Sequence, residues 1–166
     1  NAGTVLDGPG SGVMEIDGGT LNPSGSVTID ILKVGLSAPG SHTQTAQMYT
    51  ISTLTLGNAT YRLAGGTLNV GQVLNTTGAG TLNLDGGTFD PSGSVNVDQL
   101  GVGIVSAGTH TQTAQTYTVG TLTLGSGTYT ISAGTLSVGG AGLHASGTGT
   151  LALDGGTVAP AGTVAV

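Results

Sequence analysis

The sequence predicts an all-β protein: a right-handed parallel β-helix (β-solenoid) whose triangular coils hold about 22–23 residues each. Three observations lead to this fold class. The chain repeats itself at a fixed long interval, short words of alternating polar and apolar residues recur within each repeat, and glycine-rich corners separate those words. Such a repeat predicts similar units stacked along one axis, because no unit can bury its apolar face alone.

The long repeat is marked by the word Asp-Gly-Gly-Thr, which begins at Asp17, Asp85 and Asp154, so the repeat length is about 68 residues. A second word, HTQTAQ, begins at His42 and again, one repeat length later, at His110. We expect the whole chain to form a single solenoid segment. Its repeat copies are approximately 1–68 and 69–137, with a partial copy at 138–166, so that the segment spans 1–166.

Within each copy, four-residue words begin at closely spaced, regular positions. TLTL begins at Thr53, TYRL at Thr60 and TLNV at Thr67, and the second copy repeats this series from Thr121. Polar and apolar residues alternate in these words, which is strand patterning, and threonine, valine and tyrosine favour strands. A seven-residue period is also typical of coiled coils, but each intervening glycine, such as Gly65, would cost a helix about 1 kcal/mol. We therefore interpret each word as a short strand that ends in a corner.

Short strands joined by glycine-rich corners predict the sides of a coil, because glycine enters positive φ without a steric penalty. With three sides a coil takes about 21–23 residues, so a copy of about 68 residues should hold three coils. About seven coils at a spacing of about 4.8 Å would form a rod about 35 Å long. Leucines such as Leu82 and Leu84 should point into the core. Right-handed winding is expected from the crossover rule for parallel strands.

The segments Ile31–Gln47 and Gln99–Gln115 fit the seven-residue rhythm least well. We interpret the HTQTAQ word in each as a wider corner or loop on one flank of the solenoid. His42 and His110 would then be polar loop residues on the same flank, three coils apart and too distant to share a metal ion.

The composition argues against several classes of function. The chain has 33 glycines and no cysteine, and only two cations, Lys33 and Arg62, against a formal net charge of −6. No basic patch is therefore expected for nucleic acid or anionic lipid. No run of about 18 apolar residues could span a membrane as a helix, and without cysteine there are no disulfides or zinc–thiolate sites. A charged fraction of 6% and a mean hydropathy of +0.27 argue against disorder.

The runs TLTLGNATYRLAGGTLNVG at 53–71 and TLTLGSGTYTISAGTLSVGG at 121–140 resemble the passenger-associated β-strand repeat of autotransporters and related large bacterial surface proteins. The matching parts are an LTL-G-x-x-TY half and an AGTLxVG half, and the resemblance covers most of the chain. The LDGGT words are also similar to those of long secreted β-solenoid proteins. The resemblance implies an extracellular right-handed parallel β-helix that forms a stalk, adhesin or surface fibre. The translocator domain of that family is not in this sequence.

The carboxylates are candidates for catalytic or metal-binding groups, because parallel β-helices also carry polysaccharide lyases and hydrolases. A glycosidase needs two carboxylates that flank the scissile bond, but most acids here recur with the copy, whereas a catalytic site is normally unique. We therefore expect no enzyme, and no catalytic, cofactor-binding or metal-binding residues. Calcium needs six to eight oxygens, and Asp-Gly-Gly words three coils apart would place single carboxylates about 14 Å from each other. The acids are Asp7, Glu15, Asp17, Asp30, Asp85, Asp90, Asp98 and Asp154.

The sequence thus predicts a structural extracellular β-solenoid, located outside the cell or at its surface, in a bacterial surface fibre, stalk or filament. The chain is cut out of phase with its repeat, and both ends fall in strand-like words. Its partners should therefore be copies of itself or flanking repeats of a longer chain, end to end. The alternative is an adhesin that binds a glycan or host surface through flank loops 31–47 and 99–115. No cofactor and no nucleic acid are expected.

Overall fold

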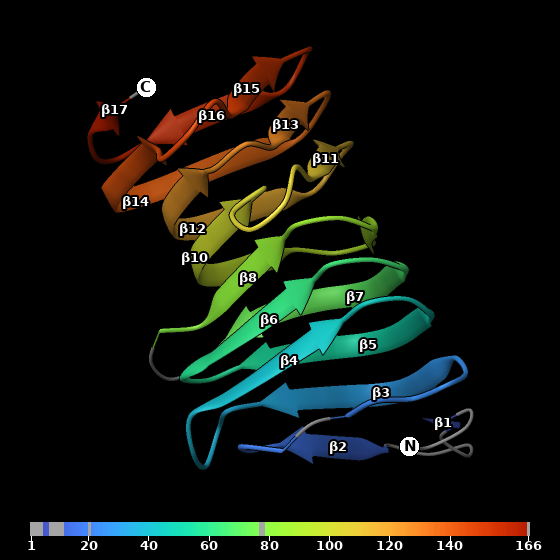
Figure 1. Cartoon of the computed structure of the whole chain (residues 1–166). Coiled ribbons are helices and arrows are strands. Elements are labelled where there is room, and N and C mark those ends of the chain that lie inside the picture. The colour runs from blue at the N-terminus through green and yellow to red at the C-terminus, as the bar shows by residue number, and fades with distance from the viewer. Residues whose placement is uncertain (1–4, 7–11, 20, 77–78, 166) are drawn as a thin grey trace.

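The computed structural model describes residues 5–6, 12–19, 21–76 and 79–165, which form seventeen β-strands. All pairs of neighbouring strands are parallel, and the chain winds about seven times around one axis as a β-solenoid (Figure 1). The predicted fold class is therefore confirmed. In this described part of the chain, no helix is long and apolar enough to cross a membrane.

Each coil has three sides, which we call A, B and C, and strands on one side lie directly above those of the previous coil. Three strands in the first half of the chain bend and run along sides A and B, and three in the second half bend and run along sides B and C. Side A consists of β1 (Val5–Leu6), the first halves of β3 (Val27–Val34), β5 (Met48–Leu56) and β7 (Thr67–Asn75), then β9 (Thr88–Pro91), β11 (Thr109–Gln112), β13 (Thr128–Ile131) and β15 (Thr150–Leu153). Side B consists of β2 (Val13–Ile16), the second halves of β3, β5 and β7, the first halves of β10 (Val95–Val102), β12 (Thr116–Leu124) and β14 (Thr135–Ala145), and β16 (Thr157–Pro160). Side C consists of β4 (Gly40–Gln44), β6 (Ala59–Leu63), β8 (Thr81–Leu84), the second halves of β10, β12 and β14, and β17 (Val164–Ala165).

The winding is right-handed. In Figure 1 the strands β4, β6 and β8 cross the near side towards the right, while β5 and β7 return behind them towards the left and the chain climbs. This is the hand that the crossover rule gives for parallel strands in one sheet.

The core is a continuous apolar column along the axis. Alternate residues of the strands point inward, and the buried cluster extends from Ile16 in the first coils to Leu143 near the top. Leu82, Leu84 and Val95 all lie in it, as the alternation of polar and apolar residues predicted. Each coil removes the apolar side chains of the previous one from water, which is the main stabilising contribution in a stacked repeat.

The ladder register shows that the predicted coil size and the predicted three coils per repeat are wrong. On side A, Val27 pairs with Tyr49, Tyr49 with Leu68, and Leu68 with Phe89, so three successive coils take 22, 19 and 21 residues. Phe89 therefore completes the third coil above Val27. The position that corresponds to Val27 in the next copy of the repeat is Val95, which lies one side further along the chain, on side B, where it pairs with Val73. One repeat consequently makes three coils and one further side.

The extra side arises because the sides are unequal in length. A strand that bends across a corner moves from one side to the next in few residues: in β5, inward Tyr49 on side A is followed within the same strand by inward Leu54 on side B. Corners with a loop take more residues, as between β3 and β4. Ten unequal sides consequently fit into a repeat for which nine equal ones were predicted.

Candidate functional site

Only the first half of each HTQTAQ word, in the candidate binding flanks, lies in a strand: HTQ ends β4 and β11, and TAQ forms the corner that follows. In β4 and β11 the polar residues alternate, so that threonines face solvent and the histidine and glutamine face the core. The predicted corner or loop is therefore wrong for HTQ and correct for TAQ, and the exposed parts of each flank are this corner and the short loop before the strand, within 35–39 and 103–108. The inward side chains are His42, Gln44, His110 and Gln112, each at most 4% exposed.

The two copies of this word do not share a flank, which corrects a second expectation. β4 lies on side C, above which β6 continues the ladder, whereas β11 lies on side A with β13 and β15. The extra side in each repeat causes this rotation. A pair of identical surfaces on one flank, as a two-site adhesin would need, is not formed by His42 and His110.

The buried glutamines bond to three neighbouring parts of the chain. Gln112 Nε2 donates to the carbonyl oxygens of Gln115 (2.6 Å) and Thr135 (3.1 Å), and its Oε1 accepts from the hydroxyl of Tyr129 (2.7 Å). Gln44 repeats this arrangement in the first copy, with Tyr61 at 2.7 Å. Each glutamine therefore bonds both to its own corner and to the next coil, and its buried amide has hydrogen-bond partners for its oxygen and its nitrogen.

The buried histidines stack on aromatic rings. The ring of His110 lies between those of Phe89 (centroids 5.3 Å apart) and Tyr129 (5.2 Å), and its Nε2 is 2.8 Å from the hydroxyl of Tyr117. His42 stacks on Tyr49, with centroids 5.6 Å apart, but both of its ring nitrogens are buried without a hydrogen-bond partner. The first copy thus carries a polar group whose burial is not compensated.

Burial keeps these side chains neutral. It lowers the pKa of His42 and of His110 to about 4, because the charged imidazolium loses its hydration inside the core. It raises the pKa of Tyr49 to about 12. Burial also raises the pKa of Tyr117, with a smaller contribution from the carboxylate of Asp90. A histidine that is neutral and enclosed in this way acts as an aromatic core residue at neutral pH.

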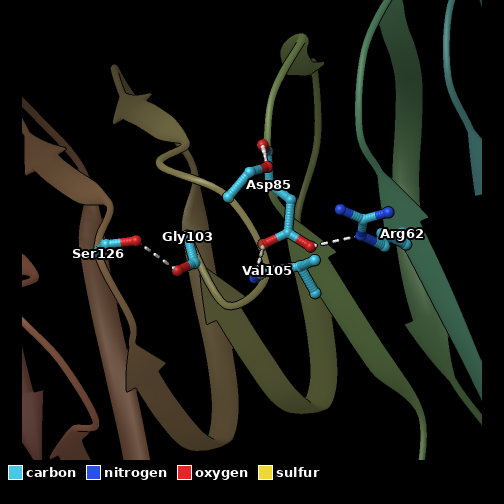
Figure 2. A network of polar contacts seen from close by, with 6 residues as sticks. Arg62, Asp85, Gly103, Val105 and Ser126 are labelled. Atoms are coloured by element: carbon cyan, nitrogen blue, oxygen red, sulfur yellow. Dashed lines mark hydrogen bonds and ion pairs between the residues drawn. The ribbon is translucent and has the colours of Figure 1, made fainter.

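The most connected polar site is the corner around Asp85, which follows β8 (Figure 2). The Asp85 side chain is fully buried; its Oδ2 accepts from Nε of Arg62 in the coil below at 2.6 Å, and its Oδ1 accepts from the backbone N–H of Val105 in the coil above at 3.0 Å. The hydroxyl of Ser106 donates to the Asp85 carbonyl at 2.5 Å. Both carboxylate oxygens are therefore occupied in holding three successive coils together at one corner.

The other recurring acids bond to backbone in the same manner. Asp30 accepts from the N–H of Gly12 at 3.3 Å, and Asp98 accepts from the N–H of Gly80 at 3.2 Å. Asp17 accepts from the N–H of Ser37, at the loop position that corresponds to Val105. Asp7 lies outside the described residues. Four of the acids that repeat with the sequence, Asp17, Asp30, Asp85 and Asp98, thus fasten corners and bends.

The three Asp-Gly-Gly words lie at three different corners, because each repeat is rotated by one side. Asp17 follows β2 on side B, Asp85 follows β8 on side C, and Asp154 follows β15 on side A. The expectation that they would stack three coils apart on one line is therefore wrong. Within the described part of the chain, no three histidine or acidic side chains come together as a metal-binding group.

The corner of Asp85 and the buried histidines are chemically suited to fastening coils. The Asp85 carboxylate is enclosed and bonded on both oxygens, and the rings of both histidines pack against aromatic rings. In comparisons with known proteins, no family model, no curated protein and no solved structure matches this chain.

Proposed function

We propose that this chain is a structural rod, a segment of an extracellular bacterial surface fibre, stalk or filament. The observation that carries the proposal is the use of the repeated residues. Most of the histidines, glutamines and aspartates that recur between copies contact a neighbouring coil, as at Gln112 and Asp85. Residues repeated for ligand binding would be exposed, whereas the repeated histidines and glutamines and Asp85 are buried in the stack. The resemblance to bacterial surface repeats supports the same role.

The partner we propose is a further coil of the same repeat, supplied by flanking repeats or by a second copy, end to end. Leu153 is 61% exposed on the uppermost coil, while its counterpart Leu84 is 2% exposed inside the stack. Val164 is likewise 51% exposed, while its counterpart Val95 is 0% exposed. The same side chains are therefore buried wherever a further coil covers them, and a coil of this kind fits the exposed end in shape and in strand edge.

The test of the rod is imaging of the native material. Negative-stain electron microscopy of the cell surface, with antibody raised against this chain and gold-labelled, should show label along continuous thin filaments on intact cells. Label confined to discrete particles, or detected only after cells are permeabilised, would contradict a surface filament. As a control, a purified array of several copies should have the same width as the filaments labelled on cells.

A second candidate, an adhesin, is favoured by one observation on the flank 99–115. In the loop 103–108, Ile104 is 40% exposed and Val105 is 67% exposed, so that an apolar tip projects beside the Asp85 corner. Apolar tips of this kind contact glycan rings or partner surfaces. The double variant Ile104→Ser and Val105→Ser should abolish adhesion and leave filaments intact if the adhesin proposal holds. Unchanged adhesion would leave the structural rod as the function.

A further inference from the structure

The hydrogen-bonded ladder is interrupted at one place on side A. β9 pairs with β7 below it, and β11 pairs with β13 above it, but β9 and β11 are not paired, so β11, β13 and β15 form a separate three-stranded sheet. The same two coils remain joined on the other sides through β10 and β12, whose register includes Val95 with Tyr117 on side B and Gln99 with Thr121 on side C. We call the unpaired junction of β9 and β11 the seam. The two coils are therefore unpaired on side A and paired on sides B and C.

A cavity of about 220 Å³ lies at the seam. A second cavity, of about 380 Å³, lies at the corresponding place of the first copy, next to β4 and the corner after β2. The opening thus recurs with the sequence repeat, although the two copies face different directions. The seam cavity is lined by Gly87, Thr88, Phe89, Thr109, His110 and Thr111.

Side chains and one corner hold the seam together. Across it the rings of Phe89 and His110 are in contact, with centroids 5.3 Å apart. At the adjacent corner the N–H of Gly103 donates to the carbonyl of Leu84 at 2.9 Å, and the N–H of Val105 donates to Asp85. No strand ladder adds to these contacts at the seam, so separation of β9 from β11 breaks fewer bonds than separation at any paired side.

His110 is the titratable group at this junction. It faces Phe89 of β9, Tyr117 of β12 and Tyr129 of β13, none of which is charged at neutral or acidic pH, and the acidic side chain of β9, Asp90, points outward and is exposed. A proton on His110 would therefore place a positive charge among rings without a facing carboxylate. His110 also lines the cavity at the seam. Burial lowers its pKa to about 4, so the closed seam resists protonation.

We propose that the seam is an acid-opened joint: when His110 takes up a proton, β9 and β11 separate on side A while sides B and C stay paired. The separated state hydrates the imidazolium, and acid therefore shifts the population towards it. The joint recurs in the array wherever a repeat provides the buried histidine and the open junction. This inference goes beyond the rod proposed above and is tested on the isolated protein, so that either can fail alone.

Hydrogen exchange at two matched glycines measures the opening. The Gly103 N–H bonds across the corner next to the seam, and the Gly125 N–H bonds to Val102 at the same corner one coil higher, where the strands of side A are paired. Protection factors, corrected for intrinsic exchange, should be recorded by NMR at pH 7 and pH 4. We expect the ratio of the Gly103 to the Gly125 protection factor to fall at least tenfold on acidification. Parallel changes at the two glycines would overturn the proposal.

Two variants connect the change to His110 and to the seam. His110→Phe keeps a ring of similar size but cannot be protonated, and its ratio should not change between pH 7 and pH 4. The pair Thr88→Cys and Thr109→Cys, whose outward side chains flank the seam, should lock it as a disulfide in a chain with no other cysteine. The oxidised lock should show no change of the ratio with pH, and its reduced form should respond like the native protein. A full response in the oxidised lock would overturn the proposal even if His110→Phe does not fold.

Discussion

Val27 and Val95 hold the same place in the sequence repeat but lie on different sides of the solenoid. Val27 pairs with Tyr49 on side A, and Val95 pairs with Val73 below and Tyr117 above on side B. Each repeat is therefore rotated by a third of a coil, and three repeats, or ten coils, return to the starting side. Any feature that recurs once per repeat is distributed evenly around the rod.

The rotation predicts the length of longer arrays. Each added copy should extend the rod by about 16 Å, which is three and a third coils at about 4.8 Å. Small-angle X-ray scattering on arrays of two, five and eight copies measures the increment as the slope of the maximum dimension against copy number. A slope of about 14 Å per copy, the value for three whole coils, would contradict the register.

The Asp85 corner should be far more sensitive to substitution than its exposed counterpart. Asp85→Asn removes the negative charge and leaves one acceptor oxygen for two donors, Arg62 Nε and the Val105 N–H, and we expect the free energy of unfolding to fall by about 2–4 kcal/mol. The value should lie towards the lower end, because the Arg62 side chain is 27% exposed and regains water. Urea unfolding provides the measurement.

The matched control for this substitution is Asp154→Asn, at the third copy of the same word. Asp154 is exposed, so its replacement should change the free energy of unfolding by no more than about 0.5 kcal/mol. Equal losses at Asp85 and Asp154 would show that the buried contacts of Asp85 do not stabilise the stack.

The effect of replacing a corner glycine on stability should likewise depend on its position. Gly66 has φ of +77°, and a Cβ there would collide with the backbone oxygens of Ala46 and Gln47 in the coil below. Gly66→Ala should therefore lower the free energy of unfolding by about 3 kcal/mol or more. At Gly19 a Cβ meets no atom within 4 Å, so Gly19→Ala should be within about 0.5 kcal/mol of neutral. Thermal unfolding followed by circular dichroism distinguishes the two, and similar melting temperatures would refute close coil contact at Gly66.

Stability should depend on pH through the buried histidines. Between pH 6.5 and pH 4 the unfolded chain binds protons at His42 and His110 while the folded chain does not, so the free energy of unfolding falls as the pH falls. The loss should reach roughly 3 kcal/mol per histidine below pH 4. Urea titrations at intervals from pH 7 to pH 4 measure it. The double variant His42→Phe, His110→Phe should remove this dependence, and an equal slope in that variant would assign it to carboxylates instead.

The buried tyrosines predict a loss of stability at high pH. The unfolded chain ionises them near pH 10, but in the folded protein burial raises the pKa of Tyr49 to about 12 and that of Tyr61 well above 10. The folded state holds these protons longer, so stability should be constant up to about pH 10 and fall above it. Urea midpoints that rise between pH 10 and pH 11 would contradict this assignment.

The buried polar residues of the two HTQ words were predicted wrongly as loop residues. The words HTQ at 42–44 and 110–112 alternate with period two like any other strand, and this was the signal for inward side chains. Their polar character suggested a loop instead. The groups that satisfy Gln44, namely Tyr61 and the carbonyl of Thr67, lie 17 and 23 residues away and become neighbours only after the chain has wound.

The sequence by itself determined the strand words, the glycine corners, the leucine core at positions such as Leu82 and the parallel solenoid, because these follow from local alternation and from a repeated pattern. Only the tertiary structure decided how many sides one repeat makes. That number depends on where a strand bends across a corner, as between Tyr49 and Leu54, and on how many residues a loop adds, as between Val34 and Gly40. The sides of neighbouring coils come into register only when their strands pair. The number of residues in each side is therefore fixed by the ladder and not by the local sequence.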